Sequence, residues 1–210
     1  MKTALVFGGA FNPPTIAHVS LADFARRETN SEEVIFVPTK NTYIQNTQHK
    51  SFAFSNEERL DMLKLLADSR SWMRVSAFEI ESASQPRTYM TLKHLRDQGY
   101  ACRLLFGSDK LHELEKEWMY VEEIAHEFGM VCLSRSTDNP EMMIENDEYL
   151  RTLKPYIQVI SAPETTRNMS STQVRNELAL IQEHLSVIRG IVPEELIGRM
   201  LTYLERGNSQ

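Results

Sequence analysis

Short apolar runs alternate with amphipathic stretches along most of this chain. Runs rich in β-branched and aromatic residues are typical of buried parallel strands, and they occur at 4–7, 33–38, 72–80, 101–107, 130–135 and 156–160. Apolar residues at helical spacing predict helices at 19–25, 57–67, 88–96, 140–154 and 194–205. This alternation predicts an α/β fold, a Rossmann-like doubly wound parallel sheet with a C-terminal helical extension over 182–206.

The composition fits one domain with its own hydrophobic core. The chain has 210 residues, 41% of them hydrophobic, and a formal net charge of −6. Nucleic-acid surfaces are basic, so this charge argues against a nucleic-acid partner. Cys102 and Cys132 lie in predicted strands, which favours buried, reduced thiols in a cytoplasmic protein over a zinc site. We expect neither a signal peptide nor a membrane span, because only a short apolar run precedes Gly8.

The most informative stretch is the turn from Gly8 to His18, between the first predicted strand and the first predicted helix. The adjacent Gly8 and Gly9 allow the backbone a sharp bend and a close approach to a ligand. N–H groups at the start of a helix attract anions. Thr15 and His18 are three residues apart, so they share one face of the helix near that end. The turn therefore predicts a phosphate site, with an ordinary turn and a surface histidine as the alternative.

Two common nucleotide-binding patterns are absent from the sequence. Dinucleotide-binding oxidoreductases carry G-x-G-x-x-G in the first turn and an acidic residue at the end of the second strand. Here the second predicted strand ends at Pro38 without an acidic residue, and no G-x-x-x-x-G-K-[ST] segment occurs. The sequence thus argues against an oxidoreductase of this kind and against a P-loop NTPase.

A long polar loop over 39–54 follows the second predicted strand. It carries Lys40, His49 and Lys50. Loops at the carboxyl ends of parallel strands commonly form the site of an open α/β fold, although many are merely solvated. Ser55 and Glu58 then match a capping box that opens the helix over 57–67. Arg59 on this helix fits a solvated charge and a phosphate ligand equally well.

Two later segments carry candidate nucleotide ligands. Gly107 ends a predicted strand and Asp109 begins a helix, where the carboxylate serves either as a helix cap or as an acceptor for both hydroxyls of a ribose. Ser170, Ser171, Thr172 and Arg175 follow the last predicted strand. A helix N-terminus with hydroxyls and an arginine is a second anion site. Between the segments, Glu113, Glu115, Glu117, Glu122 and Glu123 indicate a solvated helical face rather than a metal site.

The turn resembles the T/H-x-G-H signature of the nucleotidylyltransferase superfamily, in the form G-G-x-F-x-P-x-H-x-G-H found in nicotinate mononucleotide adenylyltransferases. Thr15 stands where a first histidine is usual, and Ala17 stands where glycine is usual. The block 107–118, G-x-D-x-L-x-x-L followed by Trp118, and the block 168–175, similar to I-S-S-T-x-x-R, follow in the family's order. The resemblance covers nearly the whole chain and implies a single nucleotidylyltransferase domain over 1–210.

The resemblance implies transfer of AMP from ATP to nicotinate or nicotinamide mononucleotide, with release of pyrophosphate, in NAD biosynthesis. It places Thr15, His18 and Arg175 at the reacting phosphates. The implied ATP-binding residues are Gly8, Gly9, Ala10, Phe11, His18, Gly107, Asp109, Ser170, Ser171, Thr172 and Arg175. The implied acceptor-binding residues are Lys40, His49, Lys50, Arg87, Thr88, Trp118 and Arg135. Mg²⁺ is expected mainly on the ATP phosphates, without a protein metal site, and a homo-oligomer is compatible with the family.

Three other functions are compatible with parts of this pattern. A related nucleotidylyltransferase using phosphopantetheine or a cytidylyl acceptor shares the turn; the segment from Arg87 to Leu92 only partly matches the family's S-Y-T-x-D-T-L loop. A class I aminoacyl-tRNA synthetase has similar motifs, but this chain is too short and too acidic for a tRNA-binding domain as well. A nucleotide-binding regulatory module without catalysis is supported only by Ala17 and the altered acceptor loop.

Overall fold

The computed structural model describes residues 1–42, 54–134, 138–161 and 185–207. Its strands are β1 (Lys2–Gly9), β2 (Glu33–Pro38), β3 (Met73–Val75), β4 (Tyr100–Gly107), β5 (Met130–Ser134) and β6 (Ile157–Ser161). They form a sheet of order β3-β2-β1-β4-β5-β6, the order of a doubly wound α/β fold. The predicted fold class is therefore confirmed.

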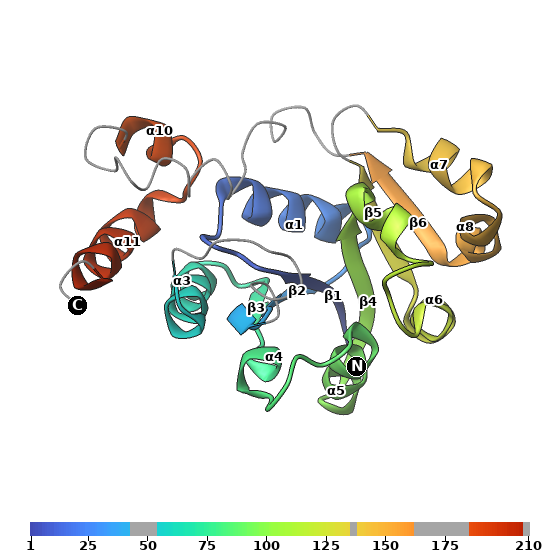
Figure 1. Cartoon of the computed structure of the whole chain (residues 1–210), viewed down its shortest axis with the longest axis horizontal. Coiled ribbons are helices and arrows are strands. Elements are labelled where there is room, and N and C mark those ends of the chain that lie inside the picture. The colour runs from blue at the N-terminus through green and yellow to red at the C-terminus, as the bar shows by residue number, and fades with distance from the viewer. Residues whose placement is uncertain (43–53, 135–137, 162–184, 208–210) are drawn as a thin grey trace. The chain divides into compact units, whose positions relative to one another are not determined.

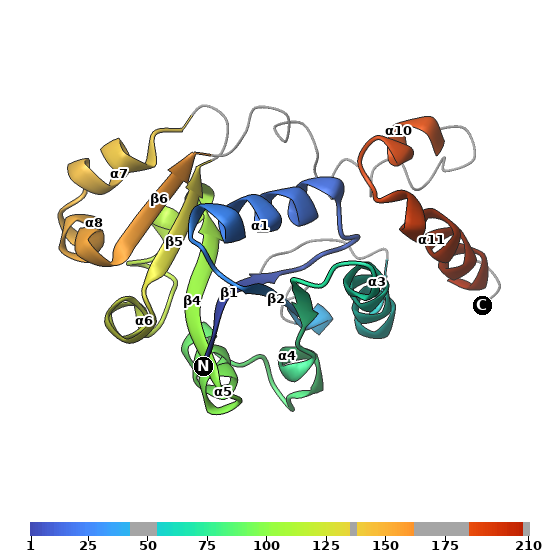
Figure 2. The ribbon, with the colours of Figure 1, turned by 180° about the vertical axis from the view of Figure 1, so that it is seen from behind.

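Helices lie on both faces of this sheet. The helices of the structure are α1 (Ile16–Glu28), α3 (Asn56–Asp68), α4 (Phe78–Glu81), α5 (Thr88–Asp97), α6 (Val121–Phe128), α7 (Pro140–Asn146), α8 (Glu148–Leu153), α10 (Leu185–Arg189) and α11 (Glu194–Gly207), with 3-10 helices η1 (Ser108–Glu113) and η2 (Lys154–Tyr156). The ribbon shows α1 on one face, with α5 and α6 on the other (Figures 1 and 2). Within the described ranges, no helix combines the length and apolar composition that a membrane span requires.

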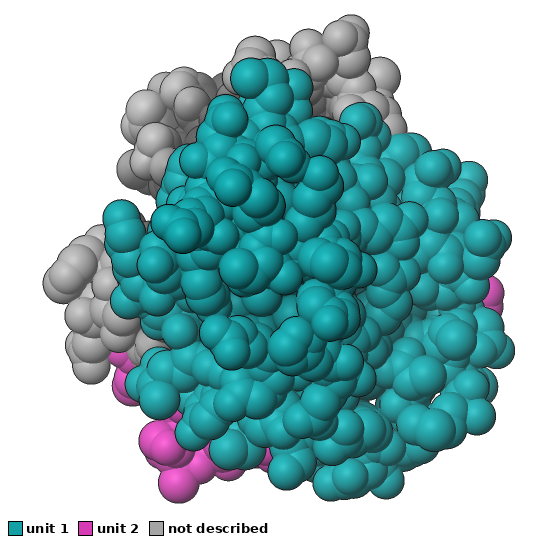
Figure 3. Space-filling model, turned by 90° about the vertical axis from the view of Figure 1, so that its right-hand side faces the viewer, with its two compact units in different colours: residues 1–8, 21–35, 86–167 teal, residues 9–20, 36–85, 168–210 magenta. Residues whose placement is uncertain are grey.

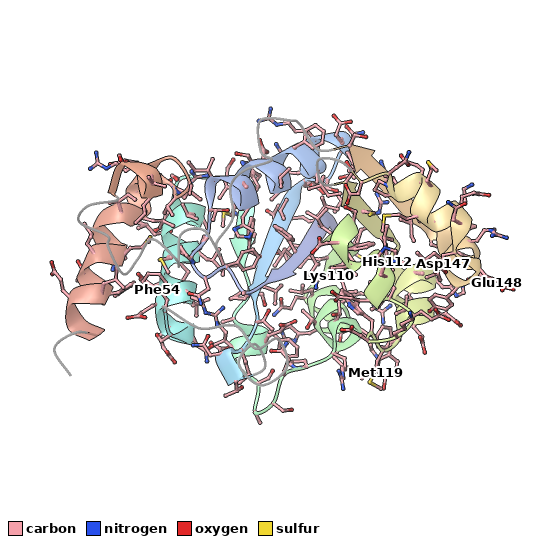
Figure 4. All side chains as sticks on the ribbon, turned by 45° about the horizontal axis from the view of Figure 1, so that its top comes forward. Phe54, Lys110, His112, Met119, Asp147 and Glu148 are labelled. Atoms are coloured by element: carbon pink, nitrogen blue, oxygen red, sulfur yellow. The ribbon has the colours of Figure 1, made fainter. Side chains whose placement is uncertain are left out.

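Three predicted elements are wrong in detail. The strand predicted over 72–80 ends at Val75, and a one-turn helix, α4, follows it. The helix predicted over 140–154 is two helices, because Asp147 leaves helical geometry (φ −109°, ψ 126°) and caps α8 by accepting from the N–H of Leu150. Asp147 and Glu148 lie at that break in Figure 4. The five predicted face glutamates do not share one helix, since η1 ends at Glu113 and α6 begins at Val121.

The chain divides into two compact units (Figure 3). Unit 1 comprises Met1–Gly8, Leu21–Ile35 and Pro86–Arg167. Its strands pair in parallel: Phe7 of β1 is level with Leu105 of β4, and Leu105 is level with Val131 of β5. Leu5, Leu105 and Val131 are at most 2% exposed, as expected for the centre of a sheet covered on both faces. This register brings Gly8, at the end of β1, to the same sheet edge as Gly107.

Unit 2 comprises Gly9–Ser20, Phe36–Gln85 and Asn168–Gln210. In it α11 packs on α3, where Glu195 pairs with Arg70 at 2.8 Å and the hydroxyl of Tyr203 donates to Asp61. Phe54, labelled in Figure 4, lies edge-on to the Tyr203 ring with 6.4 Å between centroids. The segment before α11 reaches the start of α1, where the Ile16 N–H donates to the Ile191 carbonyl at 2.8 Å. The segment between α10 and α11 therefore bonds to the first residue of α1.

Candidate active site

The turn after β1 is built around Phe11. Phe11 is 2% exposed and has a φ of 45°, a left-handed conformation that a bulky residue seldom adopts. Its ring contacts Phe36 and His18, with centroid distances of 5.3 and 5.1 Å. A Cβ on Gly9 would lie 3.1 Å from Cζ of that ring, a tight contact, so a larger residue at this position would crowd the ring. The left-handed backbone at Phe11 thus places its aromatic ring against the imidazole of His18.

Thr15 and His18 form reciprocal hydrogen bonds at the start of α1. The Thr15 carbonyl accepts from the Val19 N–H at 3.3 Å, which makes Thr15 the N-cap residue. The Thr15 hydroxyl oxygen accepts from the His18 N–H at 3.3 Å, and the Thr15 N–H donates to His18 Nδ1 at 3.0 Å. This is the pattern of a capping box, with histidine in place of the usual glutamate. The predicted proximity of the two side chains is confirmed.

These bonds assign the tautomer of neutral His18. A backbone N–H only donates, so Nδ1 accepts from Thr15 and the ring hydrogen is on Nε2. The Thr15 hydroxyl lies 2.9 Å from the same Nδ1 and is 0% exposed. The hydroxyl is therefore placed to orient the imidazole. The ring's hydrogen-bond donor, Nε2–H, lies on the side of the ring opposite to Thr15. The first turn of α1 carries no acidic side chain, so the positive end of the helix dipole adds to this donor.

Two cations expected near the site lie against backbone oxygens of unit 2. Arg59 is 0% exposed and donates to the Ala10 and Thr39 carbonyls. It is therefore neither the solvated charge nor the phosphate ligand that the sequence suggested. Burial lowers the pKa of its guanidinium to about 10, which leaves it charged at neutral pH. The Lys40 ammonium donates to the Ile80 carbonyl at 2.7 Å and to the Ser82 carbonyl. Lys40 therefore binds carbonyls at the C-terminal end of α4, which spans Phe78–Glu81 with Ser82 as its C-cap residue.

Unit 1 places Gly107 and Asp109 at the carboxyl end of β4. Gly107 is the N-cap residue of η1, and Asp109 in its first turn is exposed. Between them Ser108 is 0% exposed and its hydroxyl donates to Asp138, a bond that the sequence did not suggest. Lys110 and His112 lie on η1 in Figure 4. The strand end thus presents the Asp109 carboxylate and buries the neighbouring hydroxyl.

The remaining acceptor candidates of unit 1 lie on two segments. Trp118 follows η1, and its ring is 6.5 Å from that of Phe106, with an angle of 53° between them. Trp118 is half-buried. Arg87 is the exposed N-cap residue of α5 and Thr88 is its first residue. No acidic side chain lies in the first turn of α5.

Seven predicted site residues lie outside the described residues. They are His49, Lys50, Arg135, Ser170, Ser171, Thr172 and Arg175. Of the others, Gly9, Ala10, Phe11, Thr15, His18 and Lys40 belong to unit 2, and Gly8, Arg87, Thr88, Gly107, Asp109 and Trp118 belong to unit 1. The sequence does not indicate two buried contacts near these residues, those of Arg59 with the Ala10 and Thr39 carbonyls and that of Ser108 with Asp138.

The two cysteines are buried, as predicted. Burial raises the pKa of Cys102 to about 11 and that of Cys132 to about 12, the latter with help from Asp138, Glu141 and Asp109. Both thiols are therefore protonated at neutral pH and neither is an activated nucleophile. Within 1–42, 54–134, 138–161 and 185–207, no three His, Cys, Asp or Glu side chains form a metal site.

Comparison with known proteins gives consistent matches. The family model described as cytidylyltransferase-like matches residues 6–177. A probable nicotinate-nucleotide adenylyltransferase of Clostridium botulinum is 31% identical over 85% of this chain and 88% of its own length. One from Listeria welshimeri is 30% identical over 82% of this chain and 84% of its own. These relatives match along most of their length, so the similarity is not confined to the turn.

Solved structures show the same fold. The nicotinic acid mononucleotide adenylyltransferase of Plasmodium falciparum, complexed with NaAD, superposes with a TM-score of 0.73 at 20% identity, covering 97% of this chain and 96% of that one. A putative nicotinate-nucleotide adenylyltransferase of Vibrio parahaemolyticus gives a TM-score of 0.59 at 18% identity, covering 97% and 99%. The chain is thus a cytidylyltransferase-like protein and belongs to the nicotinate-nucleotide adenylyltransferase family.

Proposed function

We propose that this protein transfers AMP from ATP to nicotinate mononucleotide. A phosphate oxygen of the mononucleotide attacks the α-phosphorus of ATP, the bond to the β-phosphate breaks, and pyrophosphate leaves. The observation that carries the proposal is the Thr15–His18 capping box, which assigns the donor hydrogen to Nε2 at the first turn of α1. A fixed donor at a helix N-terminus stabilises charge that develops on a phosphate in the transition state.

The reaction needs positioning and charge stabilisation rather than a covalent nucleophile. In this proposal His18 donates to a phosphate oxygen at the reacting centre, and Thr15 fixes its tautomer. The Gly8–Phe11 turn and Asp109 contact the nucleoside, with Arg175 and Ser171 on the β- and γ-phosphates. Trp118, Arg87 and Thr88 bind the pyridine nucleotide. The protonated thiols of Cys102 and Cys132 take no part.

We expect Mg²⁺ to enter this site bound to the phosphates of ATP. The groups around the turn are donors: the N–H groups, Nε2–H of His18 and the positive end of α1. They match phosphate oxygens but offer no carboxylate to a cation. Mg²⁺ commonly keeps its waters and binds substrate phosphates, so the triphosphate itself is its main ligand, and there it shields negative charge.

The proposal also specifies which molecule accepts the AMP group. The names of the relatives favour nicotinate mononucleotide over the amide, phosphopantetheine or a cytidylyl acceptor. Exposed Arg87 at the start of α5 supplies a cation for a carboxylate or a phosphate. The acidic net charge of −6 supports a small-molecule substrate rather than nucleic acid. Buried, protonated thiols fit a cytoplasmic enzyme.

Pyrophosphate release tests the proposal directly. The protein is incubated with Mg²⁺, either ATP or CTP, and one of nicotinate mononucleotide, nicotinamide mononucleotide or phosphopantetheine. We expect release with ATP and nicotinate mononucleotide, and a dinucleotide product. Release only with phosphopantetheine or only with CTP would assign another acceptor or nucleotide. ATP binding without release in any mixture would indicate a regulatory module.

A further inference from the structure

Arg59 is a buried arginine whose hydrogen bonds reach the backbone of the turn. It lies on α3 at helical spacing from Met62, Leu63 and Leu66, all of which are 0% exposed. The arginine is 0% exposed as well. An apolar side chain of similar size would fill this position without the cost of burying a charge. Its position therefore calls for an explanation beyond packing.

The guanidinium connects two loops at the carboxyl ends of β1 and β2. One nitrogen, Nη1, donates to the Ala10 carbonyl at 2.5 Å. The other, Nη2, donates to the Thr39 carbonyl at 2.6 Å and to the side-chain oxygens of Asn41 and Asn56 at 2.6 and 2.8 Å. The same loops are joined by a bond from the Thr39 N–H to the Gly9 carbonyl at 2.9 Å.

The bond to Ala10 determines the direction of a backbone donor. The Ala10–Phe11 peptide is planar, and in a trans peptide the carbonyl oxygen and the N–H point in opposite directions. Since the Ala10 oxygen is held against Arg59 in the interior, the Phe11 N–H points away from Arg59. The left-handed Phe11, with φ of 45°, also needs its surroundings to hold it in that conformation.

We propose that Arg59 is a positioning residue that holds the Ala10–Phe11 peptide so that the N–H donors of the turn face the phosphates of ATP. This inference rests on the proposed function. Arg59 touches the turn and not the substrate, so it acts in two ways: it sets how much of the free protein has a binding-competent turn, and it keeps the donors in place once the nucleotide is bound. When that fraction falls, the apparent affinity for nucleotide falls by the same factor.

The experiment compares Arg59→Met, Arg59→Lys and the control Arg70→Met. Arg70 also stabilises unit 2, through the Leu66 carbonyl and Glu195 at 2.8 Å each, but none of these bonds reaches the turn. We measure binding of a non-hydrolysable ATP analogue by calorimetry, kcat and both KM values, and the thermal midpoint. For Arg59→Met we expect the analogue Kd to rise about tenfold, through loss of the competent fraction.

The effect on turnover separates positioning from stability. We expect kcat of Arg59→Met to fall about 10- to 100-fold, since misplaced donors cost rate, while the KM for the mononucleotide stays within about twofold. Arg59→Lys keeps the charge but lacks the planar fork, so it recovers only part of the affinity and provides a second variant if the methionine protein does not fold. Arg70→Met lowers the thermal midpoint and leaves Kd and kcat unchanged.

Equal nucleotide affinity in wild type and Arg59→Lys would overturn the inference. So would an equal loss of affinity in Arg70→Met, which would assign the effect to general stability. If the wild type binds the analogue but releases no pyrophosphate, the proposed transfer fails while the binding arm still decides the role of Arg59. If the wild type does not bind the analogue, both the proposed function and this inference fail.

Discussion

Two helices, α1 and α3, begin with the same pair of reciprocal hydrogen bonds but with different residues. At α3, the Ser55 N–H donates to Glu58 Oε2 at 2.8 Å, and the Glu58 N–H donates to the Ser55 hydroxyl at 3.2 Å. At α1, Thr15 and His18 take these places at 3.0 and 3.3 Å. Both pairs satisfy N–H groups that the helix leaves without intrahelical acceptors.

The two helices differ in the side chain at the third helical position, which is Glu58 in α3 and His18 in α1. An ionised glutamate only accepts, and its charge opposes a phosphate at the helix N-terminus. A neutral imidazole accepts with one nitrogen and donates with the other. At α3 the capping box only stabilises the start of the helix. At α1 the same bonds also orient the Nε2–H donor of His18. Local stability and chemistry therefore share the same bonds at α1, and substitutions can separate them.

Replacement of His18 by glutamate should give the largest effect. His18→Glu restores the capping box of α3 at α1, so the thermal midpoint should stay within a few degrees of wild type. The Nε2–H donor is lost and a negative charge faces the triphosphate, so we expect kcat/KM to fall about 10³-fold or more. Pyrophosphate release and thermal unfolding measured on the same preparation check both halves.

His18→Ala is the matched control for that substitution. It removes the donor without adding charge, so kcat should fall by roughly 10²- to 10³-fold, the scale of one lost charge-stabilising donor. It also removes the acceptor of the Thr15 N–H, so this variant should be less stable than His18→Glu. Near-normal turnover in the alanine variant would exclude His18 from the reaction.

Thr15→Val should give a smaller loss of activity. The valine keeps the backbone N–H that donates to Nδ1 but removes the buried hydroxyl beside the ring. We expect kcat to fall about tenfold through looser orientation of His18, with little change in the KM for ATP. Thr15→Ser should retain most of the activity. A large increase in the KM for ATP would instead show that the hydroxyl contacts the nucleotide itself.

Much of the fold could be predicted because its elements carry local signals. The apolar runs of β1, β4 and β5 predict buried strands, and the structure confirms them. The Ser55–Glu58 capping box was recognisable because it depends on four neighbouring residues. The strand predicted to Ile80 failed because a run of apolar residues does not distinguish a strand from the short helix α4.

The site was predicted less completely, for two physical reasons. The spacing of Thr15 and His18 gave their shared face, but the tautomer follows from the direction of hydrogen bonds, which spacing does not contain. Arg59 was misplaced because both alternatives for it, a solvated charge and a phosphate ligand, required an accessible guanidinium, whereas the side chain is 0% exposed. The helical spacing of 59, 62, 63 and 66 put it on the buried face, yet its partners, the Ala10 and Thr39 carbonyls, come from distant parts of the chain.

Ser55→Ala should give the smallest change in activity. It removes the side-chain acceptor of the Glu58 N–H and should lower the free energy of unfolding by about 1 kcal/mol, the usual cost of an N-cap hydroxyl. Its kcat and KM should match wild type at a temperature where both are folded, because this cap orients no catalytic group. Urea unfolding and steady-state kinetics check the two halves. If kcat fell as far as in Thr15→Val, the caps of α1 and α3 would not differ in function, and the catalytic significance given to the Thr15–His18 pair would be wrong.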